Sequence, residues 1–237
     1  MSNISISESD YNQGNLSYLQ NSLSELFAHT ECKLREESGG KRRLLKVTCP
    51  EYYREVVMAE LSDKIAEIVA IKYKYDYFKE NVKVGGLNSI EYEILMASLI
   101  AADLEDDKKY VYERLKNLNE IAVDGVYNFR LRPLKKKWMD VAGYIPPCFI
   151  NSQLKDFITF LLENKRKRVY IDGGRVYDGN YRRLKRSTLL DGEDCKIIRE
   201  VLLSNGGVID ISGKIPEKDE YYLREYYGDK IIFSPRI

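Results

Sequence analysis

The stretch Arg168-Val169-Tyr170-Ile171-Asp172-Gly173-Gly174-Arg175-Val176-Tyr177 decides the fold of the last third of the chain. Apolar and polar side chains alternate on both sides of Asp172-Gly173, and an Asp-Gly turn between two such runs is a strong signal for a β-hairpin. The residues that follow predict a helix from Asp191 or Glu193 through Leu203, a strand at 208–211, a Tyr-rich helix at 216–227 and a strand at 230–233. We therefore expect a small C-terminal α/β lobe over residues 165–237.

Upstream of this hairpin, residues 50–164 are expected to be mainly helical, because their apolar residues recur at three- and four-residue intervals. Pro50 suits the first position of a helix, and Asn88 or Ser89 can cap another. The acidic run Asp103 to Asp107 ends or interrupts that second helix. The expected helices run from Pro50 towards Tyr77-Phe78, from Asn88 or Ser89 to the acidic run, over 108–122, from Lys135 to Val141 after Pro133, and over 150–164.

The N-terminal part, residues 1–49, predicts a helix followed by a second hairpin. Residues 1–11 are polar and rich in Ser and Asn, so we expect a frayed tail there. Residues 12–28 place leucines at helical spacing, and two alternating runs around Gly39-Gly40 predict the hairpin. The whole chain therefore predicts an α+β fold, organised as three regions (1–49, 50–164 and 165–237) or as one continuous domain.

The composition is that of a soluble globular protein, with 44% hydrophobic and 32% charged residues among 237. The first ten residues have neither the basic nor the apolar region of a secretory signal. The longest apolar stretch, Ile94 to Ala102, is too short to cross a bilayer. We therefore expect an intracellular, cytoplasmic protein without a membrane span.

Counts of metal-ligating residues exclude several kinds of site. His29 is the only histidine, so no site can be built from two or three imidazoles. The acidic run Asp103 to Asp107 has no matching carboxylates elsewhere, and we interpret it as a solvated helix end rather than a cation site. No Cys-x-x-Cys pair occurs, so we expect reduced thiols, no metal and no cofactor. The four cysteines are Cys32, Cys49, Cys148 and Cys195.

No segment predicts a catalytic residue. The glycine pairs at Gly39-Gly40 and Gly173-Gly174 do not form a phosphate-binding loop, and hairpin turns explain both. His29 and Cys32 lie three residues apart, but a Cys–His nucleophile needs a shaped pocket and an orienting group. A histidine at a helix end is the simpler interpretation. We expect no enzyme here, and rank a phosphate-ester enzyme as the last alternative.

The net charge of +1 conceals a strong asymmetry along the chain. Residues 130–186 contain 15 Lys+Arg and 5 Asp+Glu, so this segment carries +10 while the rest of the chain carries −9. Three basic runs dominate the segment, and aromatic residues flank two of them. The candidate binding residues are Arg130, Arg132, Lys135, Lys136, Lys137, Lys165, Arg166, Lys167, Arg168, Arg182, Arg183, Lys185 and Arg186, with Phe129, Trp138 and Tyr181 as stacking candidates.

Clustered cations with neighbouring aromatics suit phosphate contacts combined with base stacking. They also suit anionic lipid or an acidic protein partner, and a solvated surface that pairs with the acidic remainder is the plain structural alternative. No RNA-recognition signature, KH loop, zinc finger or clear helix-turn-helix accompanies the runs. The first hypothesis is therefore a non-enzymatic protein that binds an unidentified partner, and the second is a nucleic-acid-binding protein.

From Tyr127 onwards, the order of segments resembles the YtxC-like sporulation protein family of endospore-forming bacteria. The hexapeptide Tyr127-Asn128-Phe129-Arg130-Leu131-Arg132 opens a helical stretch that includes Lys135 to Trp138, and residues 154–162 resemble the family's aromatic-Ile-x-x-Leu-Leu helix. The same order continues with the hairpin at 168–177, the helix at 193–203, the strand at 208–211 and the closing Asp229-Lys230-Ile231-Ile232-Phe233. The resemblance implies a link to sporulation in a bacterial cell and brings no catalytic residues with it.

Overall fold

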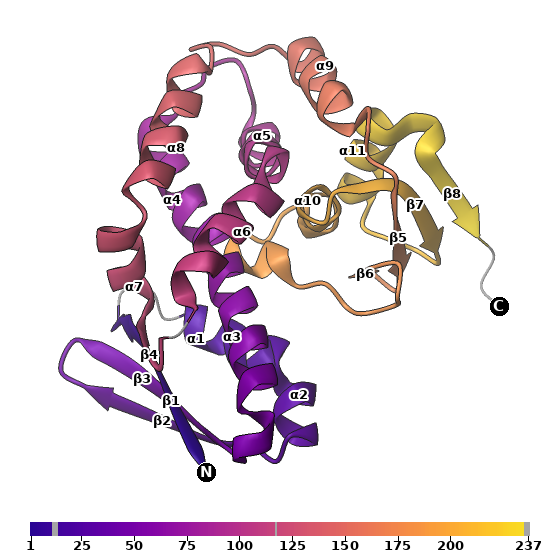
Figure 1. Cartoon of the computed structure of the whole chain (residues 1–237). Coiled ribbons are helices and arrows are strands. Elements are labelled where there is room, and N and C mark those ends of the chain that lie inside the picture. Colours follow the sequence, from indigo (N-terminus) through magenta and orange to yellow (C-terminus); the bar gives the residue numbers. More distant parts are fainter. Residues whose placement is uncertain (11–13, 117, 235–237) are drawn as a thin grey trace. The chain divides into compact units, whose positions relative to one another are not determined.

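The computed structural model describes residues 1–10, 14–116 and 118–234, and these residues form the expected α+β fold (Figure 1). The chain divides into two compact units, each built from two separate stretches. Unit 1 comprises Met1–Lys74 and Glu105–Met139, and unit 2 comprises Tyr75–Leu104 and Asp140–Ile237. This division differs from the three consecutive regions expected from the sequence, because the middle of the chain contributes helices to both units.

Unit 1 contains a four-stranded sheet in the order β2-β3-β1-β4. The predicted hairpin is confirmed as β2 (Lys33–Gly39) and β3 (Arg42–Cys49). The frayed tail predicted over 1–11 is wrong for the described residues, which end at position 10. There β1 (Ser2–Ser9) is an inner strand, antiparallel to β3 and parallel to β4 (Glu120–Ala122). The cause is a period-two pattern: Ile4, Ile6 and Glu8 are buried, and polar residues alternate with them.

The helices of unit 1 follow the predicted pattern with two differences. The single helix expected over 12–28 is two helices, α1 (Gly14–Ser22) and α2 (Ser24–His29), while positions 12 and 13 lie outside the described residues. The helix expected over 108–122 is α6 (Leu104–Leu115), and the expectation of helix at 120–122 is wrong because β4 occupies those residues. The other elements of unit 1 are η2 (Glu51–Tyr53), α3 (Arg54–Ile68), the π-helical turn η3 (Val69–Tyr73), α7 (Val123–Gly125), the π-helical turn η4 (Val126–Arg130) and most of α8 (Arg132–Tyr144). Helix α4 (Lys74–Asn81) belongs to unit 2 from Tyr75 onwards, as does the end of α8 from Asp140.

The core of unit 1 includes a buried ion pair. Lys74 Nζ lies 2.8 Å from Asp107 Oδ2, and both side chains are fully buried. The indole Nε1 of Trp138 donates to the same carboxylate at 2.9 Å, and Lys137 Nζ donates to Oδ1 at 2.7 Å. Asp107 therefore accepts three charged or polar donors, which is the arrangement that a buried carboxylate requires.

Unit 2 is built from helices and a second four-stranded sheet. The predicted helix after Asn88 is confirmed as α5 (Ser89–Ala102), and Asn88 and Glu91 form a capping box at its start. The predicted strand–helix succession downstream is also confirmed. Its elements are α9 (Asn151–Leu162), β5 (Lys167–Asp172), β6 (Arg175–Tyr177), η5 (Arg186–Leu189), α10 (Lys196–Leu203), β7 (Gly206–Ser212), α11 (Glu217–Tyr227), η6 (Gly228–Lys230) and β8 (Ile231–Ser234).

The connections of this second sheet leave its two faces different. The strand order is β6-β5-β7-β8, with β5, β7 and β8 parallel and β6 antiparallel to β5. The chain passes from β5 to β7 through α10 and from β7 to β8 through α11, so it moves across the sheet in one direction. Right-handed crossovers then place both helices on the same face. The buried residues Ile171, Ile209 and Ile211 point to that face, and the alternating residues point to the other.

Candidate functional site

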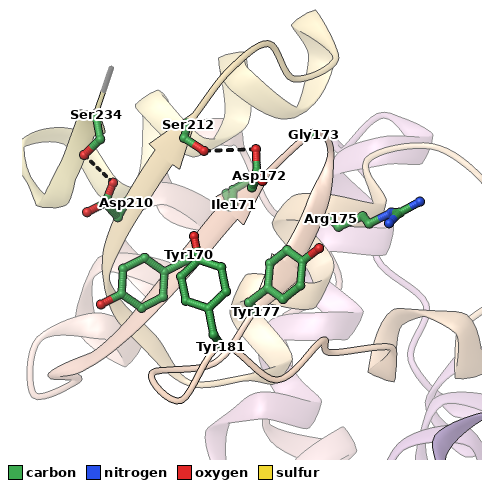
Figure 2. A pocket seen from close by; sticks show the side chains of 10 residues that line it. All are labelled: Tyr170, Ile171, Asp172, Gly173, Arg175, Tyr177, Tyr181, Asp210, Ser212 and Ser234. Carbon is green, nitrogen blue, oxygen red and sulfur yellow. Dashed lines mark hydrogen bonds between the residues drawn. The ribbon is translucent and has the colours of Figure 1, made fainter. Parts of the chain in front are cut away.

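A pocket of about 610 Å³ lies on the face of the second sheet opposite the buried side chains of Ile209 and Ile211. Pairing register explains which side chains meet there. Tyr170 of β5 lies opposite Tyr177 of β6 and Asp210 of β7, and Asp172 lies opposite Arg175 and Ser212. Cross-strand partners point to the same face of a sheet. We call this surface the open face, and Figure 2 shows the ten residues that line its pocket: Tyr170, Ile171, Asp172, Gly173, Arg175, Tyr177, Tyr181, Asp210, Ser212 and Ser234.

Three tyrosines form the aromatic part of the open face. The ring centroid of Tyr181 lies 5.0 Å from that of Tyr170 and 5.3 Å from that of Tyr177. Tyr170 and Tyr177 are half-buried within the sheet, whereas 59% of Tyr181 is exposed. Tyr181 therefore presents a large accessible ring, which packs against the rings of Tyr170 and Tyr177 in the sheet.

The loop after β6 fixes the position of Tyr181. Asp178 accepts hydrogen bonds through Oδ1 from the backbone amides of Asn180 and Arg182, both at 2.9 Å. Its carbonyl oxygen accepts from the amide of Tyr181 at 2.9 Å. These bonds hold Tyr181 at a φ of +61°, in the left-handed region that bulky residues seldom adopt. An unfavourable backbone conformation that positions a ring is a feature of binding sites more than of ordinary turns.

Arginines border the same surface. Arg183 pairs with Tyr177 in an antiparallel bridge, so both side chains lie on one face, and Arg168 lies there by alternation from Tyr170. Arg175 stands at the edge of the pocket (Figure 2). Arg168, Arg175 and Arg183 are exposed, and none has an ion pair within the described residues. Their guanidinium groups are thus available to an anionic ligand.

Two carboxylates occupy the middle of the open face. Asp172 accepts a hydrogen bond from the hydroxyl of Ser212 at 3.1 Å, and Asp210 accepts one from Ser234 at 2.6 Å (Figure 2). Each carboxylate keeps further lone pairs that can accept from a ligand. Across the described ranges, no three His, Cys, Asp or Glu side chains are arranged to hold a metal ion.

The structure divides the predicted basic residues between the two units. The run Arg130 to Lys137 lies in unit 1, and the runs Lys165 to Arg168 and Arg182 to Arg186 lie in unit 2. Within unit 2, β5 and the loop after β6 bring Arg168 and Arg183 to the open face. The other arginine there, Arg175, belongs to the sequence-predicted hairpin but not to the predicted binding runs.

Several predicted site residues have structural roles instead. Trp138 is fully buried and bonded to Asp107, so its prediction as a stacking residue is wrong. Lys137 pairs with that carboxylate, and the guanidinium of Arg186 donates to the carbonyl oxygen of Leu203 at 2.8 Å. Phe129 is 80% exposed but belongs to unit 1. Tyr181 is the predicted stacking residue that lies in the pocket.

Sequence reasoning missed the rest of the open face. The strands were predicted from their apolar residues. The side chains that alternate with these residues were not predicted to bind a ligand; they include Tyr170, Asp172, Tyr177 and Asp210. The same period-two alternation identifies them, because every second residue of each strand points to the face of the sheet that is not buried.

Comparisons with known proteins add no assignment: no family model, no curated protein and no solved structure matches the chain. Within the part of the chain that the structure describes, no helix is long and apolar enough to cross a membrane.

Proposed function

We propose that this chain is a binding protein rather than an enzyme, and that its open face binds single-stranded nucleic acid. The observation that supports the proposal is the contact between the rings of Tyr170, Tyr177 and Tyr181 beside exposed arginines without ion pairs. Aromatic rings stack on bases with little sequence preference, and arginines contact the backbone phosphates. This combination favours the nucleic-acid hypothesis over a partner of unspecified chemistry.

The carboxylates of the open face favour bases over other anionic ligands. Asp172 and Asp210 would repel a surface of anionic headgroups, but they can accept hydrogen bonds from the amino and imino groups of bases. Those groups are exposed in a single strand and engaged in pairing in a duplex. A single-stranded ligand therefore uses all three kinds of side chain on this surface, whereas anionic lipid uses only the arginines.

The cellular role that we propose rests on the resemblance to YtxC-like proteins. We propose that the chain acts in the cytoplasm of a sporulating bacterium, where binding of a nucleic acid or an acidic protein would contribute to spore formation. The resemblance over 127–237 includes β5, β6, β7 and β8, which build the open face. Expression of the protein during spore formation, and a sporulation defect in a deletion strain, would support this role.

Fluorescence anisotropy with short labelled oligonucleotides tests the binding. Single-stranded RNA and DNA should bind at low salt, and a duplex of the same sequence should bind more weakly. Charge reversal at Arg168, Arg175 and Arg183 together should reduce affinity at least tenfold. The matched control reverses Arg130, Arg132 and Lys136 in unit 1, and should change affinity little. Absence of binding at low salt, or an equal loss in both variants, would contradict the proposed site.

A further inference from the structure

Cys32 immediately precedes β2 and Cys49 ends β3, so the strand pairing of unit 1 brings them together although 17 positions separate them in the sequence. The antiparallel register of β2 and β3 pairs Lys33 with Thr48, so one step further places Cys32 opposite Cys49. Residues directly opposite in antiparallel strands have Cα atoms about 4.5–5.5 Å apart. That separation lies within the range of about 4.4–6.8 Å that a disulfide spans without backbone movement.

Directly opposite positions turn their side chains to the same face of a strand pair, so this register directs both thiols to one side. The Cys32 sulfur lies 3.1 Å from Thr30 Oγ1, whose hydroxyl donates to the carbonyl oxygen of Leu26 at 2.7 Å. Both cysteines carry free thiols in this structure, so the pair forms a reduced dithiol.

Exposure gives the two thiols different parts in a reaction. Cys32 is half-buried, whereas Cys49 is fully buried. Burial raises the pKa of the Cys49 thiol, and the neighbouring Cys32 adds to the effect. The thiolate is the reactive form of cysteine, so an external reagent would meet Cys32 first and Cys49 would react second.

We propose that Cys32 and Cys49 form a thiol–disulfide exchange site that takes low-molecular-weight disulfides such as oxidised glutathione. The Cys32 thiolate attacks one sulfur of the reagent, which breaks the reagent's S–S bond, forms a mixed disulfide and releases one thiolate. The Cys49 thiolate, its proton lost to solvent, then attacks the Cys32 sulfur and releases the second glutathione thiolate. The protein dithiol is oxidised by two electrons, and the reagent is reduced to two thiols.

Mass spectrometry of the full-length chain tests this site. The protein is equilibrated with reduced and oxidised glutathione, quenched in acid, unfolded and alkylated. Oxidation should remove two hydrogen atoms and two of the four alkylation sites, and peptide mapping should link Cys32 to Cys49. Reduction should restore all four sites.

Cysteine variants make the assignment specific. Cys49→Ser should retain glutathione on Cys32 as a stable adduct, because the second exchange step is lost. Cys148→Ser and Cys195→Ser are matched controls, one exposed and one buried, and should form the internal disulfide as the parent chain does. The proposal would be overturned if the parent chain kept both Cys32 and Cys49 alkylatable under oxidising conditions, or if either paired with Cys148 or Cys195 instead.

Discussion

The ring of Tyr181 stacks on that of Tyr177, with 25° between their planes, although the backbone of Tyr181 is in a left-handed conformation. Glycine adopts this conformation without steric cost. A tyrosine at this position therefore does not stabilise the turn, and its role lies in the placement of its ring.

Replacement of Tyr181 by glycine is expected to separate binding from stability. Affinity for single-stranded oligonucleotides should fall about 5- to 150-fold, because one stacked base contributes about 1–3 kcal/mol. The free energy of unfolding should change by less than about 1 kcal/mol, because relief of the left-handed strain offsets the added freedom of the unfolded chain. Tyr221→Ala is the matched control, since Tyr221 is 58% exposed on α11. A loss of stability that accounts for the loss of binding would contradict this prediction.

The salt dependence of binding should report each arginine of the open face. For single strands, the slope of log affinity against log salt is about −0.7 for each phosphate that the protein neutralises. We therefore expect Arg183→Gln to make the slope shallower by about 0.7. Anisotropy titrations over a series of salt concentrations measure it. An unchanged slope would mean that Arg183 does not contact a phosphate.

The buried pair of Lys74 and Asp107 predicts a large effect on stability in unit 1. Asp107→Ala should lower the free energy of unfolding by about 3–5 kcal/mol, because the buried ammonium of Lys74 loses this carboxylate. Asp106→Ala is the control: Asp106 is exposed in the same helix, and its substitution should stay within about 0.5 kcal/mol. Urea unfolding followed by circular dichroism gives both values. Similar effects of the two substitutions would show that the buried pair contributes little.

Glu200 predicts an unusual pH dependence for unit 2. Burial raises the pKa of this carboxyl above its ordinary value, although the backbone amides of Arg186 and Ser187 donate to it at 2.9 and 2.6 Å. The folded state therefore holds the proton more tightly than the unfolded chain does. The contribution to stability is complete below the unfolded pKa of about 4.3 and is lost as pH rises through the raised folded pKa.

Comparison with Glu200→Gln isolates that contribution, because the amide does not titrate. The variant should gain stability relative to the parent chain as pH rises above about 4.3, by up to about 1.4 kcal/mol for each pH unit until the folded carboxyl ionises. Loss of a hydrogen bond in the variant adds an offset that does not vary with pH. Parallel unfolding curves at all pH values would show that the pKa of Glu200 is not raised.

The sequence predicted most elements of unit 2, because turn and capping residues mark their boundaries. Asp172-Gly173 marks the hairpin, and Asn88 caps α5. The sequence prediction failed at β1, where the serines and the asparagine around Ile4 and Ile6 resemble a disordered tail by composition. The residues around Ile6 contain no signal for its partner strand, because Ile121 of β4 lies more than a hundred residues downstream.

The candidate site was predictable in its charge and not in its geometry. The basic runs were visible as composition, but burial of Trp138 depends on the distant Asp107, and the tyrosine cluster depends on the register between β5 and β6. The proximity of Cys32 to Cys49 likewise depends on the register between β2 and β3. Pairwise relationships of this kind arise from tertiary structure, which residue counts and spacing do not encode.

The interleaved arrangement of the two units has a consequence for how the chain is made. Synthesis proceeds from the N-terminus, yet unit 1 needs residues as late as Met139, and by then unit 2 has contributed mainly α5 and its flanks. Helix α5 is largely buried and packs against α9 and α10, which are synthesised later. An incomplete chain released near residue 139 would therefore expose a helix without its partners, and is expected to aggregate or to require a chaperone.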